Sequence, residues 1–131
     1  MNTYAMKYSH NSTYLPPCPE ITIILRNEDT DLSTQSLPAL LDTGADASFV
    51  PLHHLRKLRA YVIQEAFVRS HWGDRHRVHL FRIDIVLDGL TLVGMNVVGD
   101  EYGSEVILGR DVINRLRLFL DGPGSATEVF P

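Results

Sequence analysis

The fold class that this sequence predicts is an all-β domain with a closed, barrel-like sheet. Many short segments of the 131-residue chain are rich in β-branched residues or alternate between apolar and polar residues, and only two short segments have a helical pattern. The dipeptide Asp88-Gly89 between two extended segments indicates a hairpin. Since no internal repeat or linker interrupts the chain, we expect one domain.

The expected elements follow one another from residue 21 onward. Residues 1–20 are polar and end in several prolines, so we expect an arm that lies on the domain or is partly disordered, and a domain that spans residues 21–131. Residues 26–36 resemble a polar loop. We expect strands over residues 21–25, 37–41, 48–50, 61–68, 78–87, 90–98, 106–108, 118–120 and 128–130. Short helices are expected from Pro51 to about Leu58 and from Arg110 to about Arg117.

Composition and charge narrow the classes of function. The net charge of -4 provides no basic surface for nucleic acid. One cysteine, Cys18, excludes an intrachain disulfide and suits a reducing compartment. No apolar stretch approaches the ~20 residues of a membrane helix or forms a signal peptide. We therefore expect a soluble, cytoplasmic protein without nucleic-acid or membrane partners.

The strongest chemical signal is the segment Ala39-Leu40-Leu41-Asp42-Thr43-Gly44-Ala45-Asp46. Apolar residues lead directly into a carboxylate, and a carboxylate held at the end of a buried strand is desolvated, which favours sharing a proton. The Thr43 hydroxyl can bond to neighbouring backbone, and Gly44 permits a tight turn and the close approach of a substrate. The segment therefore predicts a reactive aspartate.

A second motif follows about 65 residues later, Val106-Ile107-Leu108-Gly109-Arg110-Asp111. An apolar triplet, a glycine and a helix-opening Arg or Asp make a companion to the Asp-Thr-Gly motif. With both motifs present, the sequence resembles the retropepsins, the single-domain aspartic peptidases of retroviruses, and most of all the small retropepsin-like proteins of bacterial genomes. The resemblance runs from about Glu20 to Leu120.

The resemblance implies a role for each motif residue. Asp42 is expected to be the catalytic aspartate, Thr43 to form hydrogen bonds that interlock two subunits, and Gly44 to bind substrate backbone. Asp46 is expected to accept substrate hydrogen bonds and to pair with Arg110 of the same chain, with Gly109 also in a structural role. Further substrate contacts are expected from Leu40, Ala45, Ala47 and Leu108, and from a flap that contains Ser70, His71, Trp72 and Gly73.

The number of carboxylates independently predicts a homodimer. Asp-Thr-Gly occurs once, whereas peptide hydrolysis of this type needs two carboxylates that share a proton. A two-fold axis between two copies supplies the second one through an isologous interface. We therefore predict an aspartic endopeptidase that acts on peptides or proteins and needs no cofactor.

An alternative function and several departures from the retropepsin pattern remain to be considered. The same fold can serve as a non-catalytic module for peptide binding or dimerisation. The expected flap, residues 68–76, has a single glycine and several charges, unlike the glycine-rich retroviral flaps. Arg26 is the nearest candidate for the arginine that retroviral enzymes place against Asp46 of the partner subunit. The five histidines of residues 53–79 match no zinc-ligand spacing, so we predict no metal site.

Overall fold

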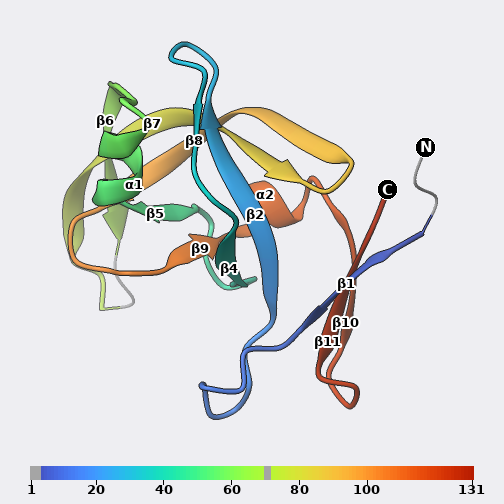
Figure 1. Cartoon of the computed structure of the whole chain (residues 1–131). Coiled ribbons are helices and arrows are strands. Elements are labelled where there is room, and N and C mark those ends of the chain that lie inside the picture. Colours follow the sequence, from blue (N-terminus) through green and yellow to red (C-terminus); the bar gives the residue numbers. More distant parts are fainter. Residues whose placement is uncertain (1–3, 70–71) are drawn as a thin grey trace.

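The computed structural model describes residues 4–69 and 72–131, which form two β-sheets and two short helices (Figure 1). The larger sheet contains β2 (Glu20–Asn27), β3 (Leu32–Ser33), β4 (Leu37–Leu41), β5 (Phe49–Pro51), β6 (Val62–Arg69), β7 (Arg75–Leu87), β8 (Leu90–Asp100) and β9 (Val106–Leu108). The smaller sheet contains β1 (Met6–Ser9), β10 (Arg117–Asp121) and β11 (Ala126–Phe130). The helices are α1 (Leu52–Lys57) and α2 (Arg110–Ile113).

The larger sheet closes on itself through β2. Its strand order is β3-β2-β4-β9-β5-β8-β7-β6, with a further pairing between β2 and β7. The first half of β2 pairs with β4, so that Ile23 lies opposite Leu37, and the second half pairs with β7, so that Ile24 lies opposite Val86. A strand shared in this way joins distant parts of the sheet into a barrel.

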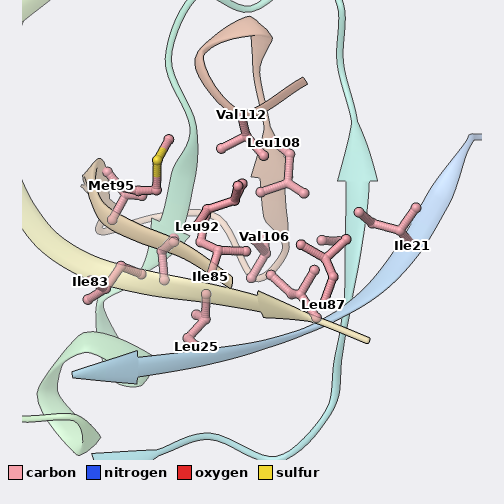
Figure 2. Close-up of a cluster of buried hydrophobic side chains, with 14 of the residues drawn as sticks. Ile21, Leu25, Ile83, Ile85, Leu87, Leu92, Met95, Val106, Leu108 and Val112 are labelled. Carbon is pink, nitrogen blue, oxygen red and sulfur yellow. The ribbon is translucent and has the colours of Figure 1, made fainter. Parts of the chain in front are cut away.

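The core fills the inside of this barrel (Figure 2). Alternate residues of β2 point inward, so Ile21, Ile23 and Leu25 are almost fully buried. Val112 of α2 covers one end of the cluster next to Leu108. Burial of one such side chain contributes about 1.5–3 kcal/mol, which explains why a chain without disulfides can hold this fold.

A bulge in β7 changes the alternation that the sequence predicts. The register shifts between Ile83 and Ile85, and both residues are buried together with Asp84 between them. Asp84 Oδ1 accepts a hydrogen bond from Gly94 N at 2.9 Å, and its other oxygen lies 3.7 Å from Arg26 Nη1. Arg26 also pairs with Asp31 at 2.6 Å, so its guanidinium is engaged within its own chain.

The N-terminal arm is partly a strand. β1 pairs antiparallel with β11, which in turn pairs with β10. The segment expected as the polar loop 26–36 contains the end of β2 and the two-residue β3.

The C-terminal helix is shorter than the expected 110–117. The amides of Arg115 and Leu116 donate to Val112 and Ile113, three residues back, so the chain tightens into turns before β10 begins at Arg117. No helix in the described part of the chain is long and apolar enough to span a membrane.

Candidate active site

The Asp42 loop begins where two parallel strands end side by side. Leu41 of β4 lies opposite Leu108 of β9, and Asp42 N donates to Leu108 O at 2.9 Å. Gly44 N donates to Asp42 Oδ1 at 2.9 Å, and Ala45 N donates to Asp42 O at 3.2 Å. The parallel pairing thus brings the two sequence motifs together, and the backbone orients the Asp42 carboxylate. Asp42 is exposed in the single chain and not desolvated as expected, because the strand ends at the buried Leu41 and the following loop reaches the surface.

A buried polar linkage supports this loop from below. Ser48 is fully buried, and its Oγ accepts a hydrogen bond from Gly109 N at 2.9 Å. The same hydroxyl donates to Asp111 Oδ1 at 2.7 Å, an oxygen that also accepts from Val112 N. Ser48 was not among the predicted site residues, and Asp111 was predicted only to open the helix that follows Gly109. The available signal was a serine at the start of a buried strand and an aspartate in the first turn of a helix.

Gly109 lies where the two motifs are closest. A Cβ at this position would lie 2.3 Å from Ala47 O and 2.8 Å from Ala45 O. Arg110 N donates to Ala45 O at 2.8 Å. The backbone of Ala45 and Ala47 therefore wraps around Gly109, and only glycine leaves room for this contact.

Arg110 holds the Asp42 loop through a carbonyl group. Its Nη1 donates to Thr43 O at 2.9 Å. The resemblance implied an ion pair with Asp46, but among the described residues no ion pair within 4.0 Å joins them, and Asp46 is exposed. The backbone bond from Arg110 to Ala45 sets the arginine alongside the loop, within reach of the Thr43 carbonyl.

The side chain of Leu108 points into the core and not onto a pocket wall. Leu108 is fully buried in the central cluster (Figure 2). Successive residues of a strand face opposite sides, so its neighbour Ile107 is half-buried on the other face, opposite Leu40 of β4. Leu40 and Ile107 are therefore the pair that flanks the site from these two strands.

The predicted flap is the hairpin of β6 and β7. Ser70 and His71 lie outside the described residues, whereas Trp72, Gly73 and Asp74 follow them, with Trp72 87% exposed and Gly73 at φ +88°. A cavity of about 590 Å³ lies between β7 and the loop after β8. Phe49, Val78, Val98 and Tyr102 are among its lining residues.

The histidines do not converge on a metal-binding arrangement in the described part of the chain. His79 Nε2 lies 3.2 Å from Glu65 Oε1, and the rings of His53 and His54 lie with their centroids 3.9 Å apart and their planes tilted by 42°. Within residues 4–69 and 72–131, no group of three or more His, Cys, Asp or Glu side chains is placed to hold a metal ion.

The end of the N-terminal arm packs beside the Asp42 loop. Leu41 N donates to Pro19 O at 3.0 Å. Burial raises the pKa of the neighbouring Cys18 thiol, and the negative charges of Glu20 and then Asp42 raise it further. The arm, Cys18 and the carboxylate of Asp42 therefore share one electrostatic environment.

Comparison of the whole structure with solved structures identifies the architecture. A retropepsin-like aspartic protease from Rickettsia conorii superimposes with a TM-score of 0.64 over 98% of this chain and 94% of its own, at 13% identity. EIAV protease, solved with the inhibitor HBY-793, superimposes with a TM-score of 0.55 over 75% of this chain and 86% of its own, at 22% identity. The chain has a retropepsin-like fold.

The retropepsin-like fold confirms the fold class that the two motifs predicted. No protein-family model matches the sequence, and no curated protein sequence matches it. At identities below 25%, the similarity establishes the fold, while activity has to be argued from the site. In this retropepsin-like domain the candidate site is the loop after β4, together with the Gly109 turn and the hairpin of β6 and β7.

Proposed function

We propose that this protein is an aspartic endopeptidase whose site forms between the Asp42 carboxylates of two identical subunits. The observation that most supports this proposal is that backbone groups orient Asp42 while leaving it exposed. Its backbone is tied to Leu108 and one carboxylate oxygen to Gly44 N, while the residue remains exposed. A carboxylate that is oriented but uncovered can meet a second one across a two-fold axis.

The chemistry follows from two carboxylates that hold one proton between them. The ionised Asp42 removes a proton from a water molecule, whose oxygen then attacks the carbonyl carbon of the scissile amide. The protonated Asp42 of the partner subunit donates to the carbonyl oxygen. A tetrahedral intermediate forms. It collapses as the leaving nitrogen takes the proton that the first Asp42 removed from water, the carbon–nitrogen bond breaks, and a hydroxyl of the intermediate returns its proton to Asp42 of the partner subunit.

The surrounding residues fit the binding of an extended peptide. Gly44 at the loop exposes backbone that a substrate can approach, and the exposed Asp46 can accept hydrogen bonds from substrate amides. The cavity of about 590 Å³ beside the hairpin of β6 and β7 can hold a side chain of the substrate, although its lining, which includes Phe49 and Val78, contains no residue of the Asp42 loop. Thr43 is exposed beside Asp42, where its hydroxyl can bond to the partner subunit.

The test is cleavage of a broad peptide library by wild type and by Asp42→Asn, followed by mass spectrometry from pH 4 to 8. We expect wild type to cut best at mildly acidic pH and to be inhibited by a statine-type peptide. Asp42→Asn should lower turnover by at least about 100-fold without loss of the fold. Asp88→Asn, at the exposed hairpin turn between β7 and β8, is the matched control and should cleave normally.

The opposite results would refute the proposal. Dimeric wild type that cuts nothing, or Asp42→Asn that cuts as well as wild type, would rule out catalysis by the paired aspartates. Peptide binding that is equal in both proteins without cleavage would indicate the non-catalytic module instead.

A further inference from the structure

The hairpin of β6 and β7 has two unlike faces. Its strands pair in regular register from Gln64 opposite Leu80 to Arg69 opposite Arg75, and directly opposite residues share a face. On one face four apolar residues are half-buried: Ala66, Val68, Val78 and Leu80. On the other face six residues are exposed: Glu65, Phe67, Arg69, Arg75, Arg77 and His79.

The half-buried face adjoins the candidate site. Leu80 lies opposite Val98 of β8, which lies opposite Phe49 of β5. Phe49 lies opposite Ile107 of β9, and Ile107 lies opposite Leu40 of β4, so one face of the sheet continues from the site to the hairpin. The exposed face, which we call the outer face, therefore points away from the cleft.

The outer face is positively charged and contains an unfavourable pairing. It carries three arginines and one glutamate, whereas the whole chain has a net charge of -4. Arg69 lies directly opposite Arg75, and like charges at such positions destabilise a sheet. Among the described residues neither arginine has an ion-pair partner within 4.0 Å, Asp74 of the adjoining turn included. An anion bound between the two arginines relieves this repulsion.

Phe67 prepares the outer face for carboxylates. It is 56% exposed, and the Arg75 guanidinium lies over its ring at 4.4 Å from the centroid. Stacking restrains a guanidinium while its planar N–H groups stay available for a carboxylate. Arg77 Nε lies 3.9 Å from Glu65 Oε2, and His79 lies nearer to the same glutamate, at 3.2 Å. An exposed pair at that distance is weak, so both arginines remain able to bind a further carboxylate.

The spacing of the arginines suits an extended chain. Arg75 and Arg77 are two positions apart in β7, so their Cα atoms are separated by roughly 6.8 Å. Every second side chain of an extended peptide repeats at the same distance, and alternating acidic residues can therefore meet both arginines. Phe67 lies opposite Arg77 and offers an apolar contact beside them. These features together fit an extended acidic segment of a protein.

We propose that the outer face of the hairpin of β6 and β7 binds an extended acidic segment of the protein substrate, outside the cleft. This inference rests on the proposed function, which supplies the substrate, and it specifies the chemistry of a second contact. Because β6 is an edge strand of the larger sheet, a chain that leaves the cleft can pass around it to the outer face. Binding there raises the local concentration of the scissile segment at the cleft.

The first test measures binding without cleavage. Asp42→Asn protein is titrated into a fluorescein-labelled peptide of alternating glutamate and valine, followed by fluorescence anisotropy. Adding Arg75→Gln and Arg77→Gln should raise the Kd at least about 10-fold, as should replacing every glutamate of the peptide by glutamine. Arg56→Gln with Lys57→Gln, at exposed positions of α1, removes the same charge and should bind like the parent. Circular dichroism verifies that all variants are folded.

The same titration separates an acidic protein segment from other anions. A labelled oligothymidine and vesicles that contain phosphatidylserine present phosphate groups in place of carboxylates. If either binds more tightly than the acidic peptide and loses this binding in the Arg75→Gln, Arg77→Gln protein, the proposed occupant is wrong. Equal binding of the acidic peptide by the parent and by this variant would also overturn the inference.

The second test measures the effect on cleavage. A peptide that wild type cleaves is compared with the same peptide joined through a flexible glycine–serine linker to the alternating acidic segment. The extension should lower KM at least about 10-fold and leave kcat unchanged. The Arg75→Gln, Arg77→Gln enzyme should cleave both peptides with similar KM. If it instead keeps the full advantage of the extension, the arginines do not form the second contact.

The outcomes separate this inference from the proposed function. Binding of the acidic peptide without any cleavage by wild type would overturn the peptidase while leaving the outer face as a binding surface. Cleavage of peptides with neither binding of the acidic segment nor a lower KM for the extended substrate would overturn the second contact while leaving the peptidase in place.

Discussion

Ser48 and Asp111 are 63 positions apart in the sequence, and their side chains meet in a hydrogen bond of 2.7 Å directly beneath the Asp42 loop. Because Ser48 Oγ also accepts from Gly109 N, one hydroxyl joins β5, the Gly109 turn and α2. The shape of the candidate site therefore depends on a polar contact in which Ser48 is fully buried and Asp111 is half-buried.

Removal of this hydroxyl should destabilise the domain. Ser48→Ala leaves Gly109 N and the Asp111 carboxylate without their buried partner, which costs about 1–3 kcal/mol of unfolding free energy. Urea unfolding measures this loss. Ser33→Ala, on the exposed strand β3, should stay within about 0.5 kcal/mol of wild type. A Ser48→Ala protein as stable as Ser33→Ala would show that the linkage carries little energy.

A methyl group at Gly109 should disturb the same region by overcrowding. In Gly109→Ala the new Cβ meets Ala47 O at 2.3 Å, a backbone atom that can move only with the loop. We expect a loss of about 2–3 kcal/mol in stability, together with loss of peptide cleavage. Gly122→Ala is the comparison, since a Cβ there meets nothing within 4 Å. Equal denaturation midpoints for the two variants would contradict the contact.

Cys18 can report on the charge of Asp42. The negative charge of Asp42 is one of the causes, after burial and Glu20, that raise the pKa of the Cys18 thiol. Asp42→Asn removes that charge, so the thiolate fraction at a given pH rises and alkylation by iodoacetamide becomes faster. The rate from pH 7 to 10 measures this effect. Asp88→Asn provides the control. An unchanged alkylation rate in Asp42→Asn would show that the charge of Asp42 does not act on the Cys18 thiol.

His54 should make the domain less stable in acid. Burial, followed by the charges of His53 and Lys57, lowers the pKa of His54 in the folded protein. The unfolded chain then binds more protons than the fold below a pH of roughly 6.5, so stability falls as the pH drops through that region. His54→Gln should show a smaller loss of melting temperature between pH 7.5 and 5. Above about pH 8 His54 is neutral in both the folded and the unfolded chain. The difference in melting temperature between wild type and His54→Gln should therefore no longer change with pH.

The local elements were largely predictable because they depend on neighbouring residues. Short apolar runs predicted β4 and β9, the dipeptide Asp88-Gly89 predicted the hairpin between β7 and β8, and Pro51 indicated the start of α1. The tightening of the chain after Ile113 was not predicted, since the apolar face of residues 112–116 fits a longer helix equally well. The bulge that buries Asp84 was also missed, because period two alone does not show where a register shifts.

The sequence by itself determined that Asp42 follows one apolar strand, that Gly109 follows a second apolar strand, and that one chain supplies one Asp-Thr-Gly motif. The tertiary structure alone decided that β4 and β9 run parallel side by side, that Arg110 holds Thr43 O, and that β1 pairs with β11 in the same subunit. The physical reason is that patterns along the chain encode which face of a strand is apolar. The choice of partner strand depends on contacts between residues far apart in sequence, which only the packed barrel brings together.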